Sequence, residues 1–242
     1  MRQFTVEEVE RAFLMRKDEA HAKDLQALVR TNLNLIGLSR QDFIDILRDL
    51  EPHLPDIEEE FIWLNFLQDL WENSYFEARL FALELMFAKS ELIDAHLWGM
   101  LDHWSNGVDN WVLSDWLGHL RAIAIRKADS LITRMTPWLT SSDPWRRRST
   151  IVSLLYIDPE TLQQELLIEP HEVFAFIEPA IEDENQAVRM ALAWLFRQIQ
   201  QRSPETLIGY LRKNKDRISP DIIKALQKPK SQTKQSFNVL TQ

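Results

Sequence analysis

The residues best suited to do chemistry lie on a predicted helix that begins at Trp111, where a tryptophan and a carboxylate stand one turn apart. At about 100° per residue, one stripe of this helix collects the aliphatic residues Leu113, Leu117, Leu120 and Ala124. The opposite stripe collects Trp111, Asp115, Gly118 and Ala122, whereas His119 lies about 80° around the helix from Trp111. Tryptophan normally lies on the buried side of a helix. The second stripe therefore either packs on a neighbouring layer or opens onto a binding surface, with Trp111 as a contact residue.

A second helix, predicted over residues 187–202, repeats this pattern. Its apolar stripe consists of Val188, Leu192, Leu195, Phe196 and Ile199. Trp194 falls off that stripe, beside alanine and glutamine residues. Aromatic side chains on small or polar faces often stack on sugars and bases, although packing is the alternative for each tryptophan taken alone. For the two tryptophans together, a binding surface and packing between helix layers both stay open.

Arg148 is the third candidate, within the run Asp143-Pro144-Trp145-Arg146-Arg147-Arg148. On a helix it lies on the same side as Trp145, Ile151 and Val152. A guanidinium on an apolar face needs a partner. That partner is either a carboxylate from a neighbouring helix pair or a phosphate.

Charge is distributed unevenly along the 242 residues. The net charge of −9 argues against a nucleic-acid partner. Residues 1–100, however, carry 10 Lys and Arg against 20 Asp and Glu, whereas residues 101–242 carry 18 against 17. A nucleic-acid footprint would therefore belong to the second part, and solvated helix faces are the alternative. Its basic residues include Arg121, Arg126, Lys127, Arg147 and Arg148.

Other kinds of chemistry find little support in the sequence. The chain has no Cys, which excludes disulfides, thiol catalysis and Cys-ligated zinc. The 6 His residues show no metal-binding spacing, and the 5 Gly residues form no phosphate-binding loop. Nothing resembles a signal peptide or a membrane span of about 18 apolar residues. We therefore expect a cytoplasmic protein that binds no metal, uses no cofactor and associates with no membrane.

The elements that must position these residues are predicted to be helices throughout. No stretch alternates like a strand, and about a dozen helices form antiparallel pairs of about 35–45 residues. Helix starts are predicted at Thr5, Ser39, Ser74, Asp109 or Asn110, Asp143, Asp158, Ser203 and Ser219, and Gly37 is a predicted left-handed helix end. At Ser74, the glutamate Glu77 is predicted to complete a capping box. Such pairs must stack to bury their apolar faces. The sequence thus predicts an all-α solenoid of HEAT-like pairs with a concave binding face over residues 1–228, and a polar, basic, frayed tail over residues 229–242.

The order and spacing of these motifs resemble one known family. Asn110-Trp111-x-x-x-Asp115, then Trp145-x-x-Arg148, then Trp194 in a late helix, is similar to the pattern of AlkD-like DNA alkylation repair glycosylases. Upstream, Leu33-Asn34-Leu35-Ile36-Gly37, Leu70-Trp71 and Phe76-Glu77-Ala78-Arg79 are also similar to segments of that family. The likeness runs from about residue 25 to residue 212.

The resemblance implies a function and a role for each site residue. The expected reaction is hydrolysis of the N-glycosidic bond of cationic N3- or N7-alkylated purines in double-stranded DNA, by a monomer without a cofactor. Trp111 and Trp194 would flank the deoxyribose, and Asp115 would stabilise the sugar cation. Arg148 would hold a backbone phosphate or the Asp115 side chain. Arg126, Lys127, Arg147 and Arg148 are the candidate DNA-binding residues.

Two other functions remain open at this point. One is a non-catalytic HEAT-like scaffold that binds DNA or a protein through the same concave face. The other is a glycosylase-derived protein that binds damaged DNA and cuts nothing.

Overall fold

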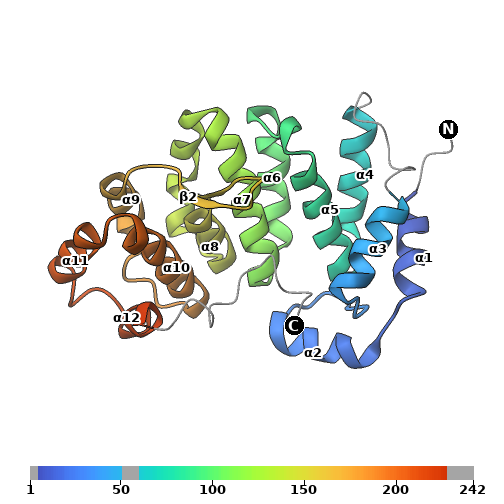
Figure 1. Cartoon of the computed structure of the whole chain (residues 1–242), viewed down its shortest axis with the longest axis horizontal. Helices are drawn as coiled ribbons and strands as arrows, with labels where there is room; N and C mark the ends of the chain where they lie inside the picture. The colour runs from blue at the N-terminus through green and yellow to red at the C-terminus, as the bar shows by residue number, and fades with distance from the viewer. Residues whose placement is uncertain (1–4, 51–59, 228–242) are drawn as a thin grey trace. The chain divides into compact units, whose positions relative to one another are not determined.

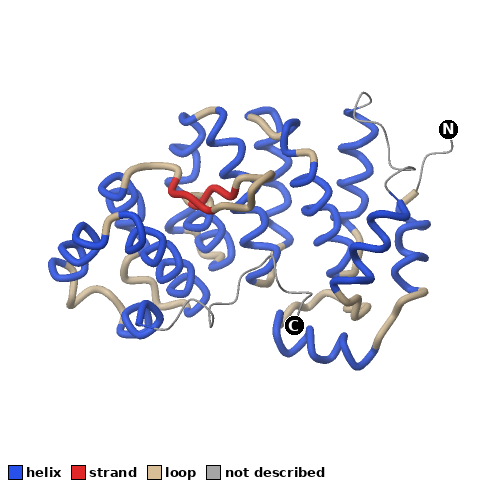
Figure 2. Tube along the Cα trace, viewed as in Figure 1, coloured by secondary structure: helices blue, strands red, loops and turns tan. Residues whose placement is uncertain are grey.

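A computed structural model describes residues 5–50 and 60–227, which form twelve α-helices and one two-stranded sheet (Figures 1 and 2). These residues divide into two compact units, one within residues 5–88 and one within residues 89–227. The prediction of one repeat domain over residues 1–228 stays a prediction. The predicted tail, residues 229–242, lies outside the described residues.

The first unit consists of five helices. These are α1 (Val6–Leu14), α2 (Glu19–Val29), α3 (Arg40–Leu50), α4 (Glu60–Glu72) and α5 (Phe76–Ala88). Helix α4 packs along α5, and α1 contacts α3 and α4. Three rings form the centre of this core: Phe81 meets Phe13 and Phe43 edge to face, with centroids 5.4 and 5.2 Å away.

A buried glutamate fixes the loop between α2 and α3. The Glu77 carboxylate accepts hydrogen bonds from the backbone N–H groups of Ile36, at 3.1 Å, and Gly37, at 2.7 Å. Gly37 has φ +87°, and a Cβ atom there would lie 2.0 Å from the Asp18 carbonyl oxygen. The predicted left-handed conformation is confirmed, but Gly37 does not end a helix, since α2 is capped by Arg30. The predicted Ser74–Glu77 capping box is also wrong, because Glu77 binds this distant loop instead.

The second unit holds the remaining helices. They are α6 (Trp98–Trp104), α7 (Trp111–Lys127), α8 (Pro144–Val152), α9 (Pro170–Ile177), α10 (Gln186–Arg202), α11 (Pro204–Lys213) and α12 (Pro220–Gln227). The 3₁₀-helices are Ser90–Leu92, Ala95–Leu97, Ser105–Gly107, Asp129–Thr140 and Glu178–Ala180. Helix α8 contacts both α7 and α10, and α11 and α12 pack on α10 (Figure 1). Helices α7 and α10 carry Trp111, Asp115 and Trp194, so α8 connects the candidate residues.

Several helix starts follow directly from local sequence. Thr5 forms a full capping box with Glu8, Asn110 accepts from the Leu113 N–H at 3.1 Å, and Asp143 accepts from the Trp145 N–H at 2.9 Å. Helices α8, α11 and α12 begin at a proline that follows the predicted cap. The predictions at Thr5, Asn110 and Asp143 are therefore confirmed.

A short hairpin corrects the expectation that no strand forms. Strands β1 (Leu155–Ile157) and β2 (Gln164–Leu166) pair antiparallel, with Leu155 opposite Leu166 (red in Figure 2). Three residues are too few for strand alternation to stand out in the sequence. The predicted helix start at Asp158 is also wrong. Its carboxylate does accept the N–H groups of Glu160 and Thr161, at 3.1 and 2.7 Å, but within a tight turn.

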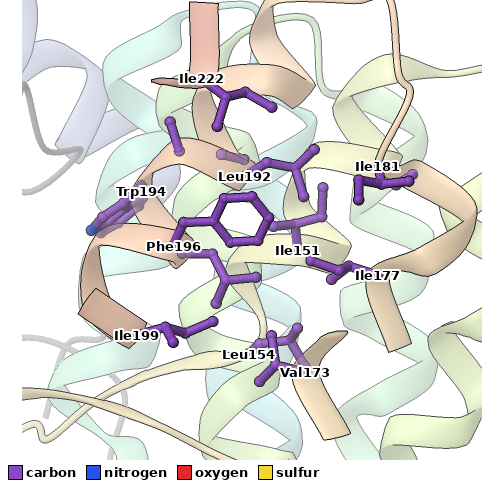
Figure 3. Close-up of a cluster of buried hydrophobic side chains, with 14 of the residues drawn as sticks. Ile151, Leu154, Val173, Ile177, Ile181, Leu192, Trp194, Phe196, Ile199 and Ile222 are labelled. Carbon is purple, nitrogen blue, oxygen red and sulfur yellow. The ribbon is translucent and has the colours of Figure 1, made fainter. Parts of the chain in front are cut away.

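Trp194 lies on a different side of α10 from the helix's apolar stripe (Figure 3). Leu192, Phe196 and Ile199 of α10 pack against Ile151 and neighbouring aliphatic residues (Figure 3). In Figure 3, Trp194 extends to the other side of α10, and its indole nitrogen points away from that cluster. Trp194 thus lies off the stripe, as predicted, but it is 6% exposed and part of the buried cluster, so it packs within the unit rather than on an open face. The all-α class is confirmed, with the hairpin as its exception.

Candidate functional site

The Asp115 and Arg148 side chains form a buried, bidentate ion pair between α7 and α8. Arg148 Nε lies 2.7 Å from Asp115 Oδ1, and Arg148 Nη2 lies 2.8 Å from Oδ2. Arg148 Nη1 donates to the Ala187 carbonyl at 2.6 Å, which connects the pair to α10. The two residues are 1% and 7% exposed. Of the two partners predicted for Arg148, the structure therefore shows the carboxylate, and each guanidinium nitrogen already donates within the chain.

Small residues on α7 explain how α8 comes so close. A Cβ atom at Gly118 would lie 2.8 Å from the Val152 Cβ and 2.9 Å from the Ser149 carbonyl oxygen. The Ser114 hydroxyl donates to the Trp145 carbonyl at 2.9 Å. The predicted second stripe of this helix thus packs on the next layer at Asp115, Gly118 and Ala122, which are all buried. That packing places Arg148 against Asp115.

Trp111 is the exception on this stripe, because it keeps part of its surface exposed. It is the first residue of α7, directly after the Asn110 cap, and it precedes Asp115 by one turn. The tryptophan predicted as a contact residue is therefore the accessible end of a stripe that is otherwise closed.

Trp194 reaches the same helix through His119, a residue that sequence reasoning placed off the site. The rings of His119 and Trp194 meet edge to face, with centroids 5.6 Å apart and planes at 77°. His119 Nδ1 lies 3.3 Å from the Leu155 carbonyl of β1, and because a carbonyl only accepts, Nδ1 carries the proton. His119 follows Asp115 by one turn. This i, i+4 spacing was the signal in the sequence that could have placed His119 near Asp115. It was missed because we assumed that one face of the helix is exposed, whereas α7 is buried on every side.

Burial sets the charge states of this cluster. Desolvation, together with a smaller contribution from the Arg148 guanidinium, lowers the pKa of His119 to about 3, against the opposing hydrogen bond to Leu155. Burial also raises the pKa of Asp115, while the paired Arg148 favours the charged carboxylate. The bidentate hydrogen bonds from Arg148 match an ionised carboxylate, and the low pKa leaves the His119 imidazole neutral near pH 7.

The predicted DNA-binding residues each contact other parts of the chain. Arg147 pairs with Asp183 through two hydrogen bonds of 2.6 and 3.1 Å. Arg126 lies 3.1 Å from Glu165, and Lys127 Nζ donates to two backbone carbonyls at 3.0 Å. The side chains of Arg126 and Arg147 are 54% and 16% exposed. Arg126 and Lys127 thus remain accessible to a phosphate, whereas Arg147 is occupied.

Arg121 belongs to the fold rather than to a basic surface. It is fully buried, and its guanidinium donates to the Ser149 hydroxyl at 2.8 Å and to the Leu101 carbonyl at 3.1 Å. The guanidinium also lies 4.9 Å from the centre of the Trp138 ring. Desolvation lowers the pKa of Arg121 to about 9. Its inclusion among the basic residues of a possible footprint is therefore wrong, because the side chain faces no solvent.

Two further properties concern metals and membranes. Within residues 5–50 and 60–227, no group of three or more metal-binding side chains is arranged to hold an ion. In the same part of the chain, no helix is both long and apolar enough to cross a bilayer.

Comparison with known proteins supports the same fold. The chain is similar to the solved structure of a predicted DNA alkylation repair enzyme from Enterococcus faecalis, with a TM-score of 0.69 and 12% identity over 90% of this chain and 98% of that one. At this identity the likeness establishes the all-α solenoid-like fold alone. Among curated proteins, none matches the chain. The model of the DNA alkylation repair enzyme family matches residues 9–225 and supports a role in DNA repair. Because that match covers most of its length, the chain belongs to the DNA alkylation repair enzyme family.

Proposed function

We propose that this protein hydrolyses the N-glycosidic bond of cationic N3- or N7-alkylated purines in double-stranded DNA, acting as a monomer without a cofactor. The observation that carries the proposal is the Asp115 carboxylate, held by Arg148 in a chain of this family. Trp111 lies one turn before Asp115, and Trp194 lies beyond His119. This arrangement provides a fixed negative charge next to aromatic surfaces.

The chemistry suits a site with a single carboxylate. When a cationic purine leaves, it takes both electrons of the glycosidic bond and becomes a neutral base. No acid is therefore needed to protonate it. The deoxyribose carbon becomes positive, water adds to that carbon, and the water's proton passes to solvent. A fixed carboxylate stabilises the developing charge electrostatically. This is glycosidic bond hydrolysis without its usual acid partner.

His119 does not provide the missing acid. With its pKa lowered to about 3 it is neutral near pH 7, and its Nδ1 proton is donated to a backbone carbonyl. Neutral lesions such as uracil and hypoxanthine are poor leaving groups that need protonation and a pocket that recognises the base. The proposal therefore restricts the substrates to cationic purines.

Burial of Asp115 constrains how the sugar approaches. The residue is 1% exposed, and the partly exposed Trp111 lies at the open end of its stripe. We place the deoxyribose beside Trp111. From there Asp115 acts through surroundings of low dielectric constant, where charge interactions extend further than in water.

The test is a panel of duplexes, each with one lesion, incubated with excess protein. We expect release of N7-methylguanine, and release of uracil and hypoxanthine no faster than in buffer. Comparable release of uracil would mean that an acid or a base pocket exists, and would contradict this mechanism.

A second candidate function is binding without cutting, as a scaffold for DNA or a protein. The observation that favours it is the full pairing of Asp115 and Arg148, both nearly buried. Binding of the N7-methylguanine duplex without release of any base would select DNA binding without cutting. If the protein neither binds this duplex nor releases a base, the scaffold hypothesis with a protein partner is selected.

A further inference from the structure

His119 occupies a central position in the second unit that the proposed chemistry does not use. It is fully buried on α7, one turn beyond Asp115. Its ring contacts β1 through the hydrogen bond to Leu155 and contacts α10 through the edge-to-face packing on Trp194. One imidazole thus connects the helix of the carboxylate to the ring of the second tryptophan.

Trp194 depends on such contacts for its orientation. Its indole Nε1 is buried, and within the described residues no hydrogen-bond acceptor lies within reach of it. Its ring belongs to the same buried cluster as Leu192 and Phe196, but it lies on the other side of α10 from them (Figure 3). Packing therefore determines the ring's position, and the imidazole edge is part of that packing. Edge-to-face pairs contribute about 0.5–1.5 kcal/mol beyond the area that they bury.

The hydrogen bond to β1 gives the imidazole a defined plane. The full burial of the ring and this hydrogen bond together fix its orientation. Because the Nδ1 proton is directed at the Leu155 carbonyl, the imidazole presents a fixed edge toward Trp194. Through these two contacts, the His119 side chain fixes the position of the Trp194 ring relative to α7, the helix that carries Asp115.

We infer that His119 is a positioning residue, which holds the Trp194 ring in the place where it can contact the sugar or base beside Asp115. The consequence for base release rests on the proposed function, whereas the positioning itself does not. The imidazole touches neither substrate nor reacting atoms in this role. It acts through Trp194 alone.

Two substitutions separate the ring contact from the hydrogen bond. His119→Phe keeps an aromatic edge against Trp194 and loses the donor to Leu155. His119→Asn keeps a donor and loses the ring. His171→Asn, at an exposed histidine of α9, is the matched control. Circular dichroism shows which variants fold, and His119→Phe keeps the proposal testable if His119→Asn does not.

The readout independent of activity is the indole N–H spectrum of the full-length, ¹⁵N-labelled chain. The chain has 9 tryptophans, and the signal missing in Trp194→Phe identifies Trp194. We expect His119→Asn to move or broaden that signal, His119→Phe to move it less, and His171→Asn to leave it unchanged. An unchanged Trp194 signal in His119→Asn overturns the proposal, whatever the activity.

The second readout is single-turnover release of N7-methylguanine well below the unfolding temperature. We expect His119→Asn to lose up to about 100-fold and His119→Phe to keep most of the rate, because a small misplacement of a positioned group has effects of this size. Equal losses in both variants would overturn the ring contact as the cause. If the parent releases no base, the proposed function fails, and the spectrum still decides whether His119 positions Trp194.

Discussion

Each unit of this protein buries a carboxylate near the start of a long helix, and the two carboxylates are used differently. Glu77 of α5 binds backbone N–H groups of its own unit's loop at Ile36 and Gly37. Asp115 of α7 binds a guanidinium from another helix and lies one turn from both Trp111 and His119. Both are 1% exposed or less, so burial alone does not identify a functional carboxylate. What distinguishes Asp115 is its side-chain countercharge, Arg148, and the partly exposed Trp111 one turn before it.

The ion pairs of the two units provide the largest expected contrast. Arg148→Ala leaves the Asp115 charge buried without its partner, which should lower the free energy of unfolding by about 3–5 kcal/mol. The matched control is Arg16→Ala, because the Arg16–Asp49 pair of the first unit has side chains that are 31% and 57% exposed. Screening by solvent limits that loss to about 1 kcal/mol. Urea unfolding of both variants measures the difference, and equal losses would show that the Asp115–Arg148 pair is not special.

The second-largest expected contrast between the two carboxylates is their effect on the rate of base release. Asp115→Asn removes the charge with almost no change of shape, and we expect single-turnover release of N7-methylguanine to fall about 100- to 1,000-fold. Glu77→Gln is the matched isosteric change, and its release rate should stay within a few-fold of the parent. Asp115→Asn also weakens a buried ion pair, so both assays must be run below the variants' unfolding temperatures. Comparable rates for Asp115→Asn and the parent would exclude Asp115 as the electrostatic residue.

The two carboxylates also show which parts of the structure sequence can predict. Helix starts at Asn110 and Asp143 follow from caps a few residues long, and both were predicted. The sequence also indicated that Arg148 needs a partner. It could not select between Asp115 and a phosphate, because that choice depends on how closely α8 approaches α7 at Gly118.

Contacts distant in sequence account for the failed predictions. Glu77 was predicted to cap its own helix, but its acceptor atoms serve a loop about 40 residues earlier. Arg121 was grouped with basic surface residues because nothing local signals that Leu101 and Ser149 enclose it. His119 was set aside on the assumption that α7 has one core face, whereas every residue from Val112 to Ile125 is buried.

Acid should destabilise the second unit through His119. The folded pKa of about 3 lies below the ordinary value of 6.5, so the folded state binds the proton less well than the unfolded state. The stability that depends on neutral His119 is complete above about pH 6.5 and is lost as the pH falls toward 3. At pH 5 the loss is at most about 2 kcal/mol.

The sign of this effect differs from that of the buried carboxylates. Desolvation raises the pKa of Glu77, so protonation of that group favours the folded state as the pH falls. A measurement on the parent alone mixes these contributions. The difference between His119→Phe and the parent isolates the histidine, and we expect it to shrink or change sign between pH 7 and pH 5. Parallel stability curves over this range would show that His119 does not carry the acid sensitivity.

The smallest expected effect concerns the charges that meet the DNA backbone, where the two units should again differ. Arg126 and Lys127 are exposed at the end of α7, whereas Arg147 is held by Asp183. Each phosphate contact contributes about −0.9 to the slope of log affinity against log salt concentration. Arg126→Glu with Lys127→Glu should therefore weaken binding to any duplex sequence and reduce the slope by roughly 2. The control is Lys23→Glu on the exposed surface of α2, which should leave the slope unchanged.

Since the first 100 residues carry 20 Asp and Glu against 10 Lys and Arg, DNA should avoid them. A slope that changes with Lys23→Glu and not with the double variant would place the DNA on the acidic unit, and would separate the binding surface from the Asp115–Arg148 pair.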